Sequence, residues 1–195
     1  MTETKENKAY TAIFTTGKEL FWKHGISRVT VEEICRGAEV SKMTFYRLFK
    51  NKNDVAEKIL IETFDANLKK YRDVMNQSVS FSQKINQLVI LKKEGTTDIS
   101  EEFIKDIFLK DVAGLKKLIE DYTKVTYDYF VSDIKTAQSN GEIRKDIKVE
   151  FIVYMLNSMT NILFDEKIKA MYPDSHDAIM EITKFFFYGL KQIED

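Results

Sequence analysis

Cationic and hydroxyl-bearing side chains gather between Thr30 and Lys52, and no acidic residue occurs between positions 40 and 52. Hydroxyl, ammonium and guanidinium groups donate hydrogen bonds to phosphate oxygens, and the cations also reach the acceptor atoms of guanine. Residues 1–52 hold ten Lys or Arg against six Asp or Glu, whereas residues 53–195 hold twenty against twenty-five. Such a basic patch on an otherwise acidic chain suits contact with nucleic acid. Charge alone still favours an ordinary solvated surface, so the spacing of the residues has to decide.

Two short helices are expected to position these side chains. Thr30 and Glu33 fit a capping box, in which the Thr30 hydroxyl accepts from the amide of Glu33 and the Glu33 carboxylate accepts from the amide of Thr30. Ser41 is a second N-cap, which opens a helix through about Phe49. Two short helices joined by a turn of a few residues predict a helix-turn-helix.

The front of the second helix is suited to reading bases. A recognition helix brings its N-terminal side chains to base edges in the major groove. Lys42 can donate to O6 and N7 of guanine, and Met43 can contact a thymine methyl group. Phe45 and Phe49 are expected to lock the short helix into the core.

Other side chains of the segment suit phosphate. Thr30 and Lys52 each stand at a helix start, where unpaired amides favour an anion. Thr44 and Tyr46 carry hydroxyls that can bind backbone oxygens, which sets the register on DNA without reading sequence. Arg47 suits either bases or phosphate. The predicted DNA contacts are Thr30, Lys42, Met43, Thr44, Tyr46, Arg47, Lys50 and Lys52.

Three short motifs occur together in this segment. They are Ala38-Glu39-Val40-Ser41 at the turn, Thr44-Phe45-Tyr46 in the second helix and Asn51-Lys52 at the next helix start. Together with Leu20-Phe21 and His24-Gly25 before them, they resemble the DNA-binding signature of the TetR family of bacterial regulators. Residues 141–146 resemble the turn that these proteins place before their penultimate helix. The resemblance implies a repressor that binds a palindromic operator in double-stranded DNA as a homodimer and is released by a small, largely apolar effector.

Two positions depart from the pattern of that family. Glu39 stands where a Gly is usual, and a left-handed Glu adds strain of about 1 kcal/mol. Leu48 replaces a His or Tyr that commonly contacts phosphate in the family, so binding is expected to depend more on Lys50 and Lys52.

Residue usage argues against several other classes of protein. Cys35 is the only cysteine, so no internal disulfide forms, and a buried helix position is favoured over a redox sensor. His24 and His176 are far apart, so neither a metal site nor a cofactor is expected. The polar N-terminus and the short apolar stretches predict a cytoplasmic protein with no membrane contact.

Apolar residues recur at helical spacing through most of the chain, and Pro and Gly are scarce, which predicts an all-α fold of about nine helices. A helix-turn-helix domain over residues 1–52 is expected to precede a helical ligand-binding and dimerisation domain over 53–195. A long helix is expected from Asn51 to about Met75, and further helices are predicted near 82–93, 100–110, 112–139, 148–170 and 175–193.

The last two predicted helices are apolar around most of their circumference, which favours an interface with a second copy over burial within one subunit. The residues predicted for this dimer interface are Phe151, Tyr154, Ile162, Ile182, Phe186, Gly189 and Leu190. Met and aromatic residues elsewhere suit an adaptable apolar pocket, although the same spacing also fits plain core. The predicted pocket residues are Phe64, Leu68, Tyr71, Phe108, Tyr122, Tyr127, Met155 and Met159.

Other functions remain open as alternatives. An enzyme is not expected, because no nucleophile stands with a base and no phosphate-binding Gly loop occurs. A helical interaction module, whose helix-turn-helix binds a protein, would tolerate loss of Lys42, Arg47 and Lys52 in DNA-binding assays. An activator on the same fold is the remaining alternative, since only the resemblance favours a repressor.

Overall fold

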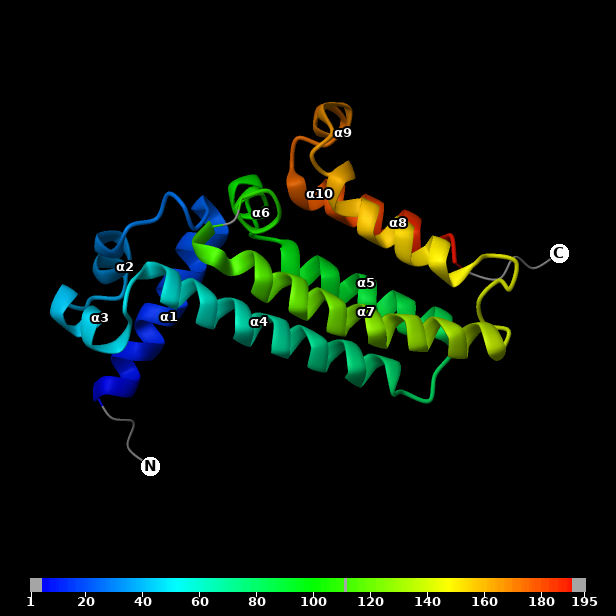
Figure 1. Ribbon diagram of the computed structural model, residues 1–195, viewed down its shortest axis with the longest axis horizontal. Coiled ribbons are helices and arrows are strands. Elements are labelled where there is room, and N and C mark those ends of the chain that lie inside the picture. Colours follow the sequence, from blue (N-terminus) through cyan, green and yellow to red (C-terminus); the bar gives the residue numbers. More distant parts are fainter. Residues whose placement is uncertain (1–4, 111, 191–195) are drawn as a thin grey trace. The chain divides into compact units, whose positions relative to one another are not determined.

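The computed structural model describes residues 5–110 and 112–190. These residues form ten α-helices and one short 3₁₀ helix, and no β-strand occurs among them. The elements are α1 Lys5–His24, α2 Val31–Gly37, α3 Lys42–Leu48, α4 Lys52–Met75, α5 Phe81–Thr96, α6 Glu101–Phe108, η1 Val112–Gly114, α7 Leu115–Ser139, α8 Val149–Ile162, α9 Glu166–Met171 and α10 Ser175–Tyr188 (Figure 1). The predicted all-α class with an N-terminal helix-turn-helix is confirmed.

Two compact units make up the chain. The first unit takes its residues from 1–66 and 99–119, and the second from 67–98 and 120–195. Helix α4 runs without interruption from the first unit into the second. The predicted boundary after residue 52 concerns a division of function, and it stays a prediction. No helix within the described residues is long and apolar enough to cross a membrane.

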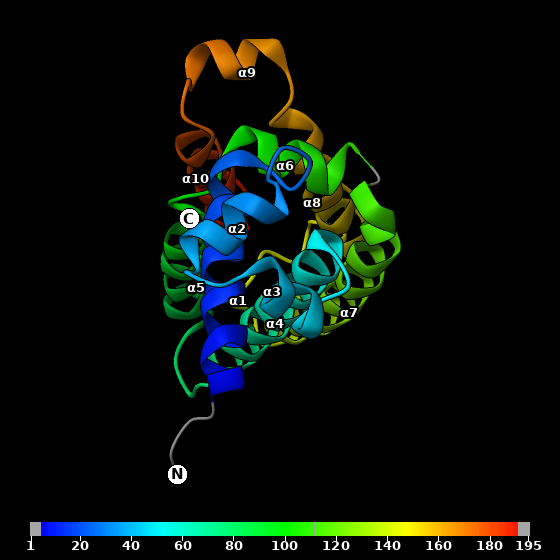
Figure 2. The ribbon, with the colours of Figure 1, turned by 90° about the vertical axis from the view of Figure 1, so that its left-hand side faces the viewer.

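Helix α1 organises the first unit and contacts α2, α3 and α6 (Figure 2). Its apolar stripe is buried at Ile13 and Phe21. Gly17 on the same stripe permits close approach of α4, because a Cβ there would stand 3.0 Å from Cγ1 of Val55. Gly25 follows α1 with φ 79°, the left-handed conformation that commonly ends a helix. Helix α1 is therefore a fixed platform for the two short helices that follow.

Helix α6 is attached to the end of α1. The amide of Ser100 donates to the carbonyl of Trp22 at 2.9 Å. The rings of Trp22 and Phe103 lie 4.4 Å apart between centroids. Residues 99–119 thus belong to the same compact unit as the helix-turn-helix, although they are distant from it in sequence.

The second unit has its own core among α5, α7, α8 and α10. Ile85, Ile134 and Ile152, on three of these helices, are fully buried. Helix α10 packs on α5, and the Oγ1 atom of Thr96 lies 3.0 Å from Nδ1 of His176. His176 stands in the first turn of α10.

Two predicted helices differ from the observed ones. The helix predicted over 148–170 is broken after Ile162, because the Asp165 side chain accepts from the amide of Lys167 at 2.8 Å and caps a separate helix, α9. The helix predicted from residue 112 begins at Leu115, after a 3₁₀ turn that ends on left-handed Gly114. The predicted end of the last helix, residue 193, lies outside the described residues.

Candidate nucleic-acid interface

The N-termini of α2 and α3 are capped by their own sequence. The Thr30 hydroxyl accepts from the amide of Glu33 at 3.2 Å, and a Glu33 carboxylate oxygen accepts from the amide of Thr30 at 2.8 Å. The predicted capping box is confirmed. Ser41 caps α3 by accepting from the amide of Thr44 at 3.1 Å. Both helix starts are therefore fixed before any ligand binds.

The turn between α2 and α3 contains one left-handed residue. Glu39 has φ 54°, which confirms the predicted departure from the usual Gly. The amide of Val40 donates to the carbonyl of Cys35 at 3.0 Å and closes the turn. Cys35 itself is buried, as predicted, and burial raises the pKa of its thiol. The left-handed backbone at Glu39 costs about 1 kcal/mol. The hydrogen bond from Val40 to Cys35 offsets this strain and holds the turn between the two helices.

Helix α3 is anchored by one face and open on the other. Phe45 and Phe49 are buried, as predicted, and the ring of Phe49 stacks on that of Tyr10 with centroids 4.9 Å apart. In contrast, Met43 is 84% exposed and Tyr46 is 56% exposed. The side chains of Met43 and Tyr46 are therefore available for contact with a partner on the outward face of α3.

Two cations on this surface are held in exposed ion pairs. The ammonium of Lys42 contacts the carboxylate of Glu32 on α2, and Nε of Arg47 lies 3.5 Å from an oxygen of Glu6 on α1. The hydrogen bond from Lys42 lowers the pKa of Glu32. Exposed pairs of this kind contribute little to stability, so a phosphate or a guanine can replace either carboxylate.

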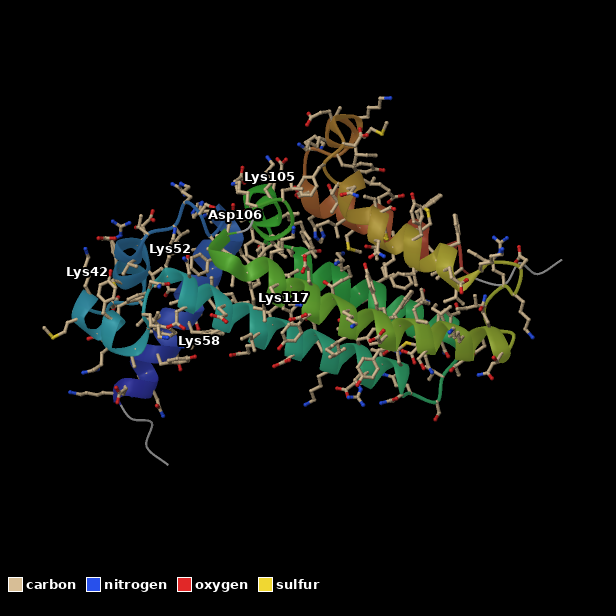
Figure 3. All side chains as sticks on the ribbon, viewed as in Figure 1. Lys42, Lys52, Lys58, Lys105, Asp106 and Lys117 are labelled. Carbon is tan, nitrogen blue, oxygen red and sulfur yellow. The ribbon has the colours of Figure 1, made fainter. Side chains whose placement is uncertain are left out.

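Lys52 stands at the start of a helix, as predicted, and its side chain is bound within the chain. Its ammonium donates to the carbonyls of Ile26, Ser27 and Val29 at 2.8, 2.8 and 2.7 Å (Figure 3). Burial lowers the pKa of Lys52. An ammonium has three protons, and all three are used within the chain. This lysine fastens the α1–α2 loop to the start of α4, and a phosphate contact at Lys52 stays a prediction.

Lys50, which precedes that helix start, remains exposed. Its amide donates to the carboxylate of Asp54 at 2.9 Å. Asn51 caps α4 by accepting from the amides of Asn53 and Asp54 at 2.9 and 3.0 Å. The exposed members of the predicted set are therefore Thr30, Lys42, Met43, Tyr46, Arg47 and Lys50, with Thr44 half-buried beside its cap.

Asp106, which the sequence analysis missed, holds the loop that precedes α2. Asp106 of α6 accepts from the amide and the hydroxyl of Ser27 at 2.8 and 2.9 Å. The same carboxylate accepts from Lys110 at 2.9 Å. Ser27 lies in the loop whose carbonyls Lys52 binds, so the loop before α2 is fastened from two sides (Figure 3). Asp106 is one of several acids in a charged segment, and no local pattern separates it from the others.

The residues predicted to bind an effector fall in both units. Phe64 packs against the first core, and Phe108 of the same unit is largely exposed. Tyr71, Met155 and Met159 pack against the second core. The remaining three, Leu68, Tyr122 and Tyr127, are half-buried in the second unit.

Two of the predicted pocket tyrosines have distinct surroundings. The hydroxyl of Tyr71 donates to Asp133 at 2.7 Å, and burial together with this hydrogen bond raises the pKa of Tyr71. Burial also raises the pKa of Tyr127. That these residues line a ligand pocket stays a prediction.

The residues predicted for a dimer interface separate into two groups. Phe151 and Tyr154 of α8 are exposed, Ile162 and Ile182 are half-buried, and Gly189 is exposed. Phe186 is only 9% exposed, its ring lies 6.3 Å from that of Phe130, and Leu190 is also buried. Phe186 and Leu190 thus belong to the core of the second unit in the single chain, and their part in a dimer interface stays a prediction.

The sequence missed Phe185, the most exposed aromatic residue of α10. Its side chain is 81% exposed, although Phe186 beside it is buried. Tyr188, one turn further on, is exposed as well. Four adjacent aromatic residues hide the helical period in the sequence, and only the packing of α10 on α5 shows which of them face outward.

No group of three or more possible metal ligands occurs within the part of the chain that the structure describes. The site consists instead of an exposed helix face with cations, hydroxyls and one methionine. That composition suits recognition of a duplex by hydrogen bonds and apolar contacts.

Several solved structures share this fold at low sequence identity. The TetR-family protein CprB from S. coelicolor A3(2) has a TM-score of 0.71 and 16% identity over 97% of this chain and 92% of that one. Fatty acid degradation regulator FadR from Bacillus halodurans has a TM-score of 0.69 and 16% identity, covering 99% of this chain and 100% of that one. Ketosteroid transcriptional regulator KstR2 of Mycobacterium tuberculosis has a TM-score of 0.66 and 14% identity, covering 99% and 98%.

No curated protein sequence matches the chain. Residues 13–59, however, match the family model described as bacterial regulatory proteins, tetR family. The match contains α2, α3, the turn at Glu39 and the start of α4, which are the elements that build the exposed surface. The helix-turn-helix segment of the chain, residues 13–59, is therefore that of the tetR family of bacterial regulatory proteins.

Proposed function

We propose that the protein is a cytoplasmic transcriptional repressor that binds a palindromic operator as a homodimer and leaves it when a small, largely apolar effector binds. The observation that carries the proposal is the exposed face of α3. Buried Phe45 and Phe49 hold the helix, while Met43 and Tyr46 face outward. A rigid helix with an outward apolar and hydroxyl-bearing face suits insertion into the major groove.

The contacts divide into base reading and positioning. Lys42 and Met43, in the first turn of α3, are proposed to reach base edges. Thr30, Tyr46 and Lys50 are proposed to bind phosphates, with Thr44 and Arg47 beside them. The lysine at position 52 acts indirectly, by fixing the loop that carries Thr30. Positioning contacts of this kind supply affinity, whereas the base contacts supply specificity.

Dimerisation is proposed through the exposed aromatic residues of α8 and α10. Phe151 and Tyr154 on α8, together with Phe185 and Tyr188 on α10, present large apolar surfaces within the second unit. Exposed aromatic residues on adjacent helices of one chain suit a two-fold interface with a second copy. Two recognition helices joined in this way have to lie about 34 Å apart to enter successive major grooves.

Release by an effector is proposed to act through α4. This helix starts beside the helix-turn-helix and continues into the second unit, so a change in either unit is carried along one rigid element. Residues 53–195 are accordingly proposed to bind the effector, and residues 1–52 to bind DNA. The effector has to prefer the state that does not bind DNA, since equal affinity for both states would shift nothing.

The test is a titration of the protein into labelled duplex from immediately upstream of its own gene, at several salt concentrations. Tight binding that weakens steeply with salt is expected, because phosphate contacts release counterions. A Lys42→Ala, Tyr46→Phe double variant should bind the duplex about tenfold more weakly or worse, whereas a Lys93→Ala control should bind it like the wild-type protein. Equal binding by all three proteins would favour the alternative in which the helix-turn-helix binds a protein partner.

A further inference from the structure

The loop that joins α1 to α2 leads directly to Thr30, which is both the N-cap of α2 and a predicted phosphate contact. No helix includes residues 25–29, so contacts with neighbouring elements have to fix their backbone. The Thr30 hydroxyl donates to Glu33 in an exposed hydrogen bond of 2.9 Å, which a phosphate oxygen can replace. The position of this hydroxyl toward DNA therefore depends on how the loop is held.

Asp106 of α6 holds the loop through Ser27 (Figure 3). One carboxylate oxygen accepts from the amide of Ser27 at 2.8 Å, and the other accepts from the Ser27 hydroxyl at 2.9 Å. The Asp106 side chain is buried, so water competes little for these bonds. Hydrogen bonds to an ionised group are roughly twice as strong as those between neutral groups. Two such bonds fix the orientation of Ser27 as well as its position.

The close approach of α6 to this loop depends on Gly25. A Cβ at Gly25 would stand 2.7 Å from Oδ2 of Asp106 and 3.2 Å from Cβ of Glu102. Helix α6 is also tied to the end of α1, since the amide of Ser100 donates to the carbonyl of Trp22 at 2.9 Å. All of these residues belong to the first compact unit. The carboxylate of Asp106 therefore meets the loop in one fixed geometry.

Lys52 holds the same loop from the side of α4. Its ammonium donates to the carbonyls of Ile26, Ser27 and Val29. Ser27 is thus bound through its amide and hydroxyl by α6, and through its carbonyl by α4. The loop has to break several hydrogen bonds before it can change conformation. A binding segment that is ordered in advance binds more tightly, because its ordering no longer opposes association.

We propose that Asp106 is a positioning residue for DNA binding, which sets Thr30 against a backbone phosphate by holding Ser27. Asp106 does not touch DNA itself, since its side chain is buried and a carboxylate repels phosphate. The inference rests on the proposed function in that Thr30 binds phosphate, and it adds a role for α6. Residues 99–119 then contribute to DNA binding, although they lie within the region proposed to bind the effector.

The experiment is a double-mutant cycle on DNA affinity. Wild-type protein, Asp106→Asn, Thr30→Val and the double variant are titrated into the labelled upstream duplex at one salt concentration, with fluorescence anisotropy as the readout. Glu102→Gln is the matched control, because it removes an equal charge from an exposed position one turn earlier on α6. Ser27→Ala is a milder variant that loses the hydroxyl bond and keeps the amide bond. Circular dichroism at the assay temperature shows which variants are folded.

Asp106→Asn is expected to weaken binding about threefold to tenfold, Ser27→Ala is expected to weaken it less, and Glu102→Gln should bind like the wild-type protein. In the Thr30→Val background, Asp106→Asn should change affinity by less than about twofold, because the contact that it positions is already absent. Equal losses in both backgrounds would overturn the proposal, as would wild-type affinity of Asp106→Asn. If Asp106→Asn does not fold, Ser27→Ala takes its place in the same cycle, with the same two outcomes.

A second duplex of shuffled sequence separates this proposal from the proposed function. Equal binding of both duplexes by the wild-type protein would contradict an operator-binding repressor. The cycle still decides the role of Asp106 on the shuffled duplex, since a phosphate contact does not depend on sequence. Selective binding by a protein in which Thr30→Val has no effect would leave the proposed function standing and overturn the positioning role.

Discussion

Asp106 and Ser27 are joined by two hydrogen bonds, at 2.8 and 2.9 Å, although 79 residues separate them in sequence. The Asp106 side chain is only 2% exposed. Ser27 lies in the loop that leads into α2, so α6 fixes the segment of chain directly before the helix-turn-helix. The carbonyls of the same loop accept hydrogen bonds from Lys52, at the start of α4.

Asp106→Asn is predicted to change the pH dependence of stability. Burial opposes ionisation of Asp106, but hydrogen bonds from Ser27 and Lys110 outweigh it and hold the pKa below its ordinary value. A lowered folded-state pKa adds stability above about pH 4, the unfolded value, and this stability is lost as pH falls through the folded-state pKa. Asn should lower the free energy of unfolding at pH 7 by about 1–3 kcal/mol and flatten its decline in acid.

Urea unfolding between neutral and acid pH measures this effect. The fluorescence of Trp22, the only tryptophan, reports it locally because its ring packs on Phe103 of α6. Lys110→Met serves as a control, since it removes only the exposed partner of Asp106. An Asp106→Asn protein that keeps the wild-type acid profile would show that the carboxylate does not hold the loop.

Lys50 and Lys52 are predicted to respond in opposite ways to the same substitution. Lys52→Met removes three hydrogen bonds to carbonyls of the α1–α2 loop and should lower the free energy of unfolding by about 2–3 kcal/mol. Lys50→Met should leave stability unchanged, because its side chain is exposed, and should weaken DNA binding while reducing its salt dependence. Urea unfolding and fluorescence anisotropy measure the two effects. The reverse pattern would restore Lys52 as the phosphate contact.

Glu32→Gln is predicted to strengthen DNA binding. Glu32 holds the ammonium of Lys42 in an exposed ion pair, and DNA has to displace it. Removal of the carboxylate charge frees Lys42 and removes repulsion of phosphate, which should raise affinity by roughly threefold at low salt. Glu62→Gln, an exposed acid of α4, is the control for net charge. Weaker binding by Glu32→Gln would mean that the ion pair positions Lys42 for DNA instead of competing for it.

Interactions between residues close together in the sequence were predicted, whereas interactions between distant residues were not. The Thr30–Glu33 capping box, the Ser41 cap and the left-handed residue at Glu39 were predicted correctly, because caps and turns act over a few residues. The hydrogen bonds of Lys52 to the α1–α2 loop were not predicted, since its partners lie more than twenty residues away.

The sequence also does not distinguish the exposed residues of α10 from the buried ones. Hydrophobic residues fill positions 185 to 188 without interruption, so their helical period cannot be read. Packing against Phe130 selects Phe186 for the core and leaves Phe185 outside.

Phe185→Glu is predicted to yield a folded monomer. Phe185 is exposed in the single chain, so a charge there leaves the core intact and opposes an apolar interface. Phe186→Glu, in the buried neighbour, should unfold the second unit instead. Sedimentation velocity gives the oligomeric state and circular dichroism the fold. A Phe185→Glu protein that remains dimeric would place the interface elsewhere.

Selection of binding sites from a pool of random duplexes tests the central claim most directly. The wild-type protein is predicted to enrich a two-fold symmetric sequence, with half-sites about one helical turn or a whole multiple of it apart. Met43→Ala should relax the preference at one position of each half-site. Absence of any enriched sequence, or enrichment of one without two-fold symmetry, would contradict a dimer that reads an operator through α3.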